Sequence, residues 1–302
     1  MTNFYRSIMK AKYIWLLVLP GMLYYLVFSY IPLYGIQIAF RDYTFIHGIG
    51  GSEWVGLQYF QELFQYGEFW QAVRNTILIS LGRIVFQFPV PIVLAILLNE
   101  VSRSALKRFY QTVFTFPHFI SWVIAYGILF NLLSSEGIIN QFLIVAGWNE
   151  IGFFTSPKAF LPLIFASDLW KTMGWNSIIF LAAIAGINPE IYEAATVDGA
   201  SRFQRMKHIM LPSLIPTASI LLILQVGNSM NAGFDQIMNM YTTNVYSVAD
   251  IIDTYIYRIG FQGSGSFSLS AAAGLFKSVI NLGLLLFANR IVKLAGQPGI
   301  WR

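Results

Sequence analysis

The sequence predicts an all-α polytopic membrane protein with six transmembrane helices, for two reasons. Hydrophobic residues make up 56% of its 302 residues and charged residues only 11%, whereas about a quarter of a soluble domain is charged. Apolar runs near the ~20 residues that a helix needs to cross a bilayer recur along the chain, without the strict alternation of barrel strands. The expected spans, in a single transmembrane domain over 1–302, are 13–40, 75–98, 113–133, 160–185, 213–232 and 268–289.

The first apolar run follows three basic residues, Arg6, Lys10 and Lys12. A secretory signal has a similar start, but this run is too long for the hydrophobic region of a signal peptide and has no small-residue cleavage pattern. We therefore expect an uncleaved first span. Residues 41–70 after it are rich in aromatic side chains and predict a loop with a short interfacial helix over 57–64.

Lysine and arginine are distributed unequally between the segments that connect the spans. With the amino terminus inside, the cytoplasmic segments hold twelve of them and the outer segments hold three. Basic residues concentrate in cytoplasmic loops, so this bias predicts that both termini and residues 188–212 are cytoplasmic. The same flanking groups account for the formal charge of +5, which therefore does not indicate a nucleic-acid partner. The twelve are Arg6, Lys10, Lys12, Arg103, Lys107, Arg108, Arg202, Arg205, Lys207, Arg290, Lys293 and Arg302; the three are Arg41, Lys158 and Arg258.

Residues 188–212 form a polar segment between two apolar runs. Asn188 before Pro189 is a helix start, because Asn caps a helix and proline is tolerated at the first helical position. The first helix is expected to end near Asp198. Residues 188–212, called the elbow below, are by themselves either an interfacial loop or a compact projection that fits the groove of a partner.

A second helix is predicted after the turn at Gly199. Glycine allows a sharp helix end, and Ser201 with Gln204 three residues later forms a capping box. This second helix is expected to stop before Pro212.

The residues of this elbow resemble a known loop in identity, spacing and position. They resemble the EAA loop of the permease subunits of ABC importers, which couples the permease to its ATPase. The matching positions are Glu193, Ala194, Ala195, Asp198, Gly199 and Gln204.

Most of the chain resembles the carbohydrate-uptake branch of this family, with its maltose-type fold, and more narrowly the subgroup that moves complex oligosaccharides. The narrower resemblance rests on WLLVLPGMLYYLVFSYIPLYGIQIAFRDY, WVGLQYF and WKTMGWNSIIFLAAIAGI. It implies a type I ABC importer permease fold in a bacterial inner membrane, importing a fragment of a polysaccharide. The implied partners are a second homologous permease in a heterodimer, two ATPase subunits and an extracytoplasmic solute-binding protein. The first arm of the elbow would sit in a groove of an ATPase subunit, with Glu193 as a polar anchor.

The chain has no residues of its own for ATP hydrolysis. No Gly-Lys dipeptide occurs, so the phosphate loop G-x-x-x-x-G-K-[ST] is absent. The three histidines lack ligand spacing and there is no cysteine, so we expect neither a metal site nor thiol chemistry. We therefore expect no enzymatic activity and no cofactor here, with ATP and magnesium bound by the partner ATPase subunits.

Amide side chains in the fifth span are candidates for the sugar pathway, because sugars offer hydroxyl groups. Gln225 and Asn228 share a helical face and Asn231 lies close beside it. An equal alternative is that these amides bind neighbouring helices.

The fourth span carries a second candidate group, Lys171, Trp175 and Asn176. If the span begins near Phe160, Lys171 lies close to mid-membrane, where a charge is functional by default. If the span begins near Met173, Lys171 pairs with Asp168 at the outer interface.

Weaker candidates are Gln87 in the second span and Tyr126 in the third. Aromatic residues such as Tyr126 are common in any span, where they more often pack in the core or at the interface. Lys277 in the last span is expected to extend its ammonium to the outer surface.

Three other functions are weighed against this one. An ATP-independent transporter or channel would carry buried acid or histidine relays, or paired broken helices, and neither is evident. ABC permeases for non-sugar solutes share the same loop. A membrane sensor or scaffold would leave the elbow unexplained.

Overall fold

The computed structural model describes residues 11–262 and 265–301 and is almost entirely helical. Five helical segments in this part of the chain are long and apolar enough to cross a membrane; a sixth results when α10 and α11, bent by 71°, count as one span. The all-α polytopic prediction is confirmed. The five segments are Lys12–Phe40, Gly67–Asn99, Trp122–Val145, Arg202–Gly227 and Phe267–Leu294, and the pair is Pro157–Ala185 with Pro189–Val197.

The chain divides into two compact units, while its assignment as a single transmembrane domain stays a prediction. Unit 1 contains the residues up to Gln65 and Ile256–Leu275, and unit 2 contains Tyr66–Tyr255 and the chain from Phe276 onward. Three basic residues of the topology argument, Arg6, Lys10 and Arg302, lie outside the described residues.

Unit 1 begins with a continuous helical segment whose first part has no buried side chain. A two-stranded antiparallel ribbon follows, in which Arg41 pairs with Trp54. The Tyr59 hydroxyl donates a 2.6 Å hydrogen bond to the Asp42 carboxylate. Partial burial raises the pKa of Tyr59 to about 12, and the hydrogen bond to Asp42 is the second largest cause of this shift. The elements are α2 (Lys12–Tyr25), η1 (Leu26–Tyr30), η2 (Ile31–Phe40), β1 (Arg41–Asp42), α3 (Gly48–Gly51), β2 (Glu53–Trp54), α4 (Gln58–Leu63), η8 (Arg258–Gln262) and the first part of α17 (Phe267–Leu294).

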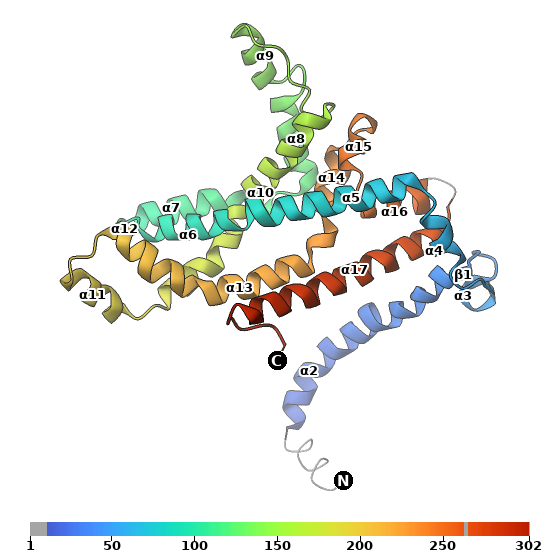
Figure 1. Ribbon diagram of the computed structural model, residues 1–302, viewed down its shortest axis with the longest axis horizontal. Helices are drawn as coiled ribbons and strands as arrows, with labels where there is room; N and C mark the ends of the chain where they lie inside the picture. Colours follow the sequence, from blue (N-terminus) through green and yellow to red (C-terminus); the bar gives the residue numbers. More distant parts are fainter. Residues whose placement is uncertain (1–10, 263–264, 302) are drawn as a thin grey trace. The chain divides into compact units, whose positions relative to one another are not determined.

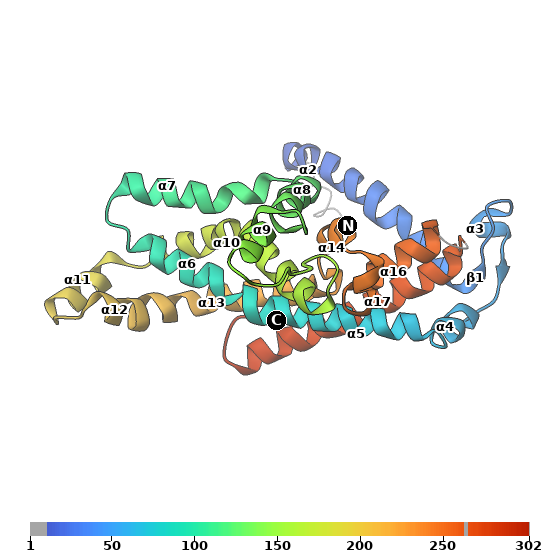
Figure 2. The same ribbon diagram turned by 90° about the horizontal axis from the view of Figure 1, so that it is seen from above.

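Unit 2 holds the remaining helices. Figures 1 and 2 agree that α11 and α12 lie at one end of this unit, together with the turn that joins α6 to α7. Its elements are α5 (Gly67–Gly82), η3 (Arg83–Gln87), α6 (Pro89–Asn99), α7 (Ser104–Thr115), η4 (Phe116–Phe119), α8 (Trp122–Leu133), α9 (Ile138–Val145), α10 (Pro157–Ala185), α11 (Pro189–Val197), α12 (Arg202–Arg205), η5 (Met206–Met210), α13 (Leu211–Gly227), η6 (Ser229–Asn231), α14 (Phe234–Met240), η7 (Thr243–Val245), α15 (Tyr246–Ala249), α16 (Ile252–Tyr257, in part) and the rest of α17.

The second span contains a widened turn at its centre. Pro89 and Pro91 lack the N–H that would bond the preceding turn, and a proline ring clashes with the carbonyl four residues earlier. The chain adopts a π-helical turn, η3, directly before them. Such turns often occur at functional sites, and this one carries Arg83 and Gln87.

The third span differs from the predicted 113–133. That range contains the end of α7, the short helix η4 and all of α8. Pro117 lies at the start of η4, and Ser121 begins α8 by accepting a hydrogen bond from the Ile124 amide at 3.3 Å. A proline and a new N-cap therefore interrupt what the apolar sequence presents as one helix.

The second arm of the elbow also differs from the prediction that it stops before Pro212. α12, η5 and α13 form one helical segment, Arg202–Gly227. Pro212 is tolerated in it because it follows directly after the π-helical turn η5 and lies at the beginning of α13. The second arm is thus the start of the fifth span.

α10 is the central helix of unit 2 and contacts α6, α7 and α13. Near its start, Phe160 and Ile164 are buried with Ile79 and Ile237. Towards its end, the buried Phe180 and Ile184 pack with residues of α6 and α13. Between the two clusters, Gly174 lets α10 approach the backbone of α7.

Candidate functional site

A cavity of about 380 Å³ lies within unit 2 between its second, fourth and fifth spans. Four of the predicted pathway residues line it, namely Gln87, Asn176, Gln225 and Asn228. The remaining lining residues are Ser80, Arg83, Ile84, Phe88, Pro91, Asp168, Thr172, Ile179, Phe180, Leu221, Ser229, Ala232 and Gly233.

One wall of the cavity carries an ion pair that sequence analysis did not single out. The Arg83 guanidinium lies 3.0 Å from the Asp168 carboxylate, with side-chain exposures of 15% and 11%. Arg83 also donates to Gln236, whose amide bonds the Ile164 carbonyl and the Ser167 hydroxyl, both at 2.8 Å. A charge at position 83, inside an apolar span, was the available signal, since such charges mark functional sites by default.

The three amides of the fifth span have separate surroundings. Gln225 and Asn228 line the cavity, but the helix ends at Gly227. Asn231 therefore lies beyond the end of α13 and does not share a helical face with Gln225 and Asn228. Residues 228–233 form turns around the short 3-10 helix η6, and such a break of the α-helix within a membrane domain is tolerated where it lines a cavity or is buried in protein.

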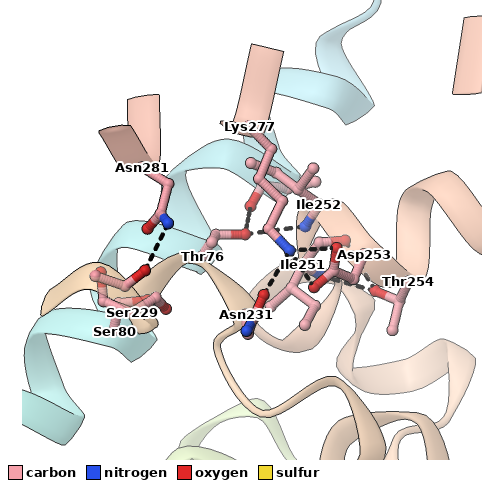
Figure 3. Close-up of polar contacts among 12 residues, drawn as sticks. Thr76, Ser80, Ser229, Asn231, Ile251, Ile252, Asp253, Thr254, Lys277 and Asn281 are labelled. Atoms are coloured by element: carbon pink, nitrogen blue, oxygen red, sulfur yellow. Dashed lines mark hydrogen bonds and ion pairs between the residues drawn. The ribbon is translucent and has the colours of Figure 1, made fainter. Parts of the chain in front are cut away.

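Asn231 instead belongs to a polar cluster around Lys277 (Figure 3). The Lys277 ammonium lies 2.7 Å from both carboxylate oxygens of Asp253 and 2.9 Å from the Asn231 amide oxygen. The expectation that Lys277 extends to the outer surface is wrong, because its ammonium has a carboxylate partner and its side chain is only 15% exposed. The cluster links α17 to α16 and η6.

Neutralising one member of this pair is expected to destabilise the protein. Lys277→Met leaves a largely buried carboxylate unpaired, so we expect a loss of about 2 kcal/mol in the free energy of unfolding. Asp253→Asn should cost a similar amount, while the double variant should lose less than the sum. Denaturant titration in mixed micelles measures this, with the exposed Lys158→Met as control. If the losses of the two single variants add up in the double variant, the ion pair itself does not contribute to the free energy of unfolding.

The candidates Lys171 and Trp175 support the break in the third span and do not line the cavity. The Lys171 ammonium donates to the His118 carbonyl at 2.7 Å and the Pro117 carbonyl at 3.4 Å. Trp175 stacks on the His118 ring with centroids 4.4 Å apart. The pairing of Lys171 with Asp168 is not formed, because Asp168 pairs with Arg83. Lys171 thus donates to carbonyl groups at the end of η4, where a cation is favourable.

Tyr126 is likewise outside the cavity. It packs against an apolar cluster, with its ring 5.6 Å from that of Phe154 in an edge-on arrangement. Tyr126 therefore packs in the core, as aromatic residues in a membrane span commonly do.

The elbow is a separate, solvent-facing feature. The Asn188 side chain caps α11 by accepting from the Glu190 amide. At the other end of α11, the Gly199 amide donates to Thr196 and the Ala200 amide donates to Ala195. This is a Schellman turn, and Gly199 supplies its left-handed residue with φ +75°.

The second arm begins with the capping box of Ser201 and Gln204. Most predicted coupling residues are exposed, and Ala195 is half-buried. Val197 at the tip is 88% exposed. Tyr192 faces the other way and packs against the cluster of α6, α10 and α13. The elbow therefore has one face attached to the spans and one face free within this chain. The exposed coupling residues are Glu193, Ala194, Asp198, Gly199 and Gln204.

No group of three or more histidine or acidic side chains within the described ranges could hold a metal ion. The geometry is that of a membrane-embedded polar cavity and a remote exposed elbow. Such an arrangement can bind a polar solute and a second protein at the same time.

Comparison with known proteins assigns the chain to a family. Residues 87–295 match the family described as binding-protein-dependent transport system inner membrane component. The chain belongs to this family. The predicted resemblance to ABC importer permeases is thereby confirmed, and with it an inner-membrane location. The side of the membrane on which the termini lie stays a prediction.

Two relatives of this transport component come from Bacillus subtilis (strain 168). Protein LplB is 42% identical over 296 residues, which cover 98% of this chain and 93% of that protein. The polygalacturonan/rhamnogalacturonan transport system permease protein YteP is also 42% identical over 296 residues, covering 98% and 92%.

Solved structures show the same fold for this permease. One chain from a bacterial ABC transporter involved in the import of the acidic polysaccharide alginate has a TM-score of 0.88 and 38% identity, covering 96% of this chain and 98% of that one. A chain from the bacterial alginate ABC transporter in complex with an alginate pentasaccharide-bound periplasmic protein has a TM-score of 0.89 and 37% identity, covering 98% and 99%.

Proposed function

We propose that the chain is one transmembrane subunit of an ATP-driven importer that moves a polysaccharide-derived oligosaccharide into a bacterial cell. The observation that carries this proposal is the likeness over nearly the whole chain to a transporter involved in alginate import. The similarity to a permease for polygalacturonan and rhamnogalacturonan points to the same class of solute. The cavity supplies the amide groups that sugar hydroxyls require.

The proposed complex contains a second homologous permease, two ATPase subunits and an extracytoplasmic solute-binding protein. ATP hydrolysis takes place in the ATPase subunits, and this chain contributes no catalytic group. Both termini and residues 188–212 face the cytoplasm. The free face of the elbow contacts an ATPase subunit, with Glu193, Ala194, Ala195, Asp198, Gly199 and Gln204 in or beside the contact.

Within this chain, α10 connects the proposed solute pathway to the proposed coupling contact. Asp168, Thr172 and Asn176 of α10 line the cavity, and the same helix ends at Ala185, directly before α11. A displacement of α11 by the ATPase subunits is therefore transmitted to the cavity wall through one continuous helix.

Reconstitution of the complex tests the proposal. The chain is co-purified with the products of its neighbouring genes, placed in proteoliposomes, and assayed for ATPase activity and uptake with oligogalacturonide and alginate fragments. We expect one oligosaccharide, delivered by the binding protein, to stimulate ATP hydrolysis and to accumulate inside. Vesicles without the binding protein serve as control. Uptake without any co-purified ATPase would instead establish an ATP-independent transporter.

A further inference from the structure

The polar groups of the cavity differ from those that a neutral sugar requires. Amides from three spans account for hydroxyl recognition, and Phe88, Ile179 and Phe180 offer apolar surface for a sugar ring. Arg83 adds a guanidinium at the same wall. A guanidinium binds carboxylates through two parallel hydrogen bonds and is always charged.

Arg83 retains unused hydrogen-bonding capacity. Its partners are the Asp168 carboxylate and the Gln236 amide oxygen. Its Nε is buried and has no hydrogen-bond partner. A guanidinium has five N–H donors, so its pairing is incomplete, and Arg83 can exchange Asp168 for a carboxylate that enters the cavity.

The buried charges around this wall do not cancel. Arg83 and Asp168 neutralise each other, but Lys171 lies one helical turn from Asp168 on α10 and is buried. Its partners in the described chain are neutral, namely two carbonyl oxygens and the ring of Trp122. The group thus has one net positive charge in a membrane-embedded region, where an unbalanced charge is costly. An incoming anion would balance it.

A glycine lets the backbone approach Arg83 closely. Gly233 has φ +79°, and a Cβ at this position would overlap the guanidinium of Arg83. The segment after α13 therefore lies directly against the guanidinium. Two other lining residues, Asn228 and Ser229, belong to this segment.

From these contacts we propose that the cavity binds an acidic sugar unit, a uronate, whose carboxylate is received by Arg83. Asp168 pairs with Arg83 at this position and is displaced as the carboxylate arrives. Gln225, Asn228 and Asn176 bind the hydroxyl groups, and Lys171 balances the charge from behind the wall. This assignment rests on the proposed function, because it names the chemical class of the oligosaccharide.

Binding of a matched pair of sugars to the permease complex tests the assignment. The intact complex in nanodiscs, without binding protein, is titrated with galacturonic acid trisaccharide and with its carboxyl-reduced, neutral counterpart, and binding is followed by saturation-transfer NMR. We expect the acidic sugar to bind about tenfold more tightly, the factor that a charge-assisted contact supplies. Arg83→Gln should abolish this preference while the neutral sugar binds as before. Arg74→Gln, on the same helix and exposed, should change neither sugar.

Asp168→Asn provides a change in the opposite direction, which a folding defect cannot produce. Removing the competing carboxylate should increase the preference for the acidic sugar, and that sugar should raise the melting temperature of this variant more than that of the wild type. If Arg83→Gln does not assemble, this gain decides the question. Equal binding of both sugars, binding of neither, an acid preference retained in Arg83→Gln, or no gain in Asp168→Asn would overturn the assignment.

A transport assay separates this result from the proposed function. ATP-driven uptake of the oligosaccharide by the wild-type complex, without acid preference in the cavity, would reject only the role of Arg83. No uptake at all would reject the importer itself.

Discussion

Replacing Gly199 by valine is expected to reduce sugar-stimulated ATPase activity and uptake about tenfold or more, while the protein still inserts and assembles. Gly199 has φ +75°, a conformation that a β-branched residue adopts only with a strain of about 2 kcal/mol or more. A strain of this size depopulates the Schellman turn by more than tenfold. A Cβ at Gly199 has no neighbour within 4 Å, so the spans are not affected. The measurement is ATPase activity and uptake in the same proteoliposomes.

Two variants separate the geometry of the elbow from backbone strain in general. Gly199→Asn should retain most of the activity, because Asn tolerates the left-handed conformation. Gly147→Val introduces the same strain at φ +80° in the loop after α9, also without steric conflict, and should leave coupling intact. Full activity of Gly199→Val would contradict the proposed coupling role of the elbow.

Replacing Gly174 by alanine should destabilise the protein by about 3 kcal/mol, through steric overlap in a tightly packed region. A Cβ here would overlap the carbonyl of Phe114 and lie 2.6 Å from the Thr115 amide nitrogen. Both are backbone atoms, so no side-chain rotation relieves the conflict. α10 would have to move away from α7, and the Lys171 contacts to Pro117 and His118 would be lost. Denaturant titration in mixed micelles measures the change.

The same substitution in α8 should have the opposite sign. Gly127 is a helical glycine with open space at its Cβ position. Gly127→Ala is therefore expected to be neutral or to stabilise by up to about 1 kcal/mol, the difference in helix propensity between the two residues. Equal effects at both positions would show that propensity, not the approach of α10 to α7, determines the result.

The elbow was predictable because its determinants are local. A proline after Asn188, a glycine at the turn, and Ser201 three residues before Gln204 each act within one helical turn. The exception is the end of the second arm. Pro212 predicts the end of a helix, but the π-helical turn η5 before it allows the helix to continue. A widened turn has no residue signature of its own.

The cavity was predictable only in part. Helical periodicity placed Gln225 and Asn228 together correctly, but failed at Asn231 because α13 ends at Gly227. The pairings of Arg83 with Asp168 and of Lys277 with Asp253 join distant parts of the chain. Such pairings depend on how helices pack, which hydrophobic patterns do not specify. Arg83 itself could have been singled out as a charge inside an apolar span.

The 71° bend between α10 and α11 has a mechanical consequence. Asn176 at the cavity and Ala185 at the end of α10 are nine residues apart, which is about 14 Å at 1.5 Å per residue. A stiff rod of this length that tilts by about 10° moves its far end by roughly 2 Å. In the proposed complex, a small movement of α11 would therefore change which polar groups of the cavity reach the sugar.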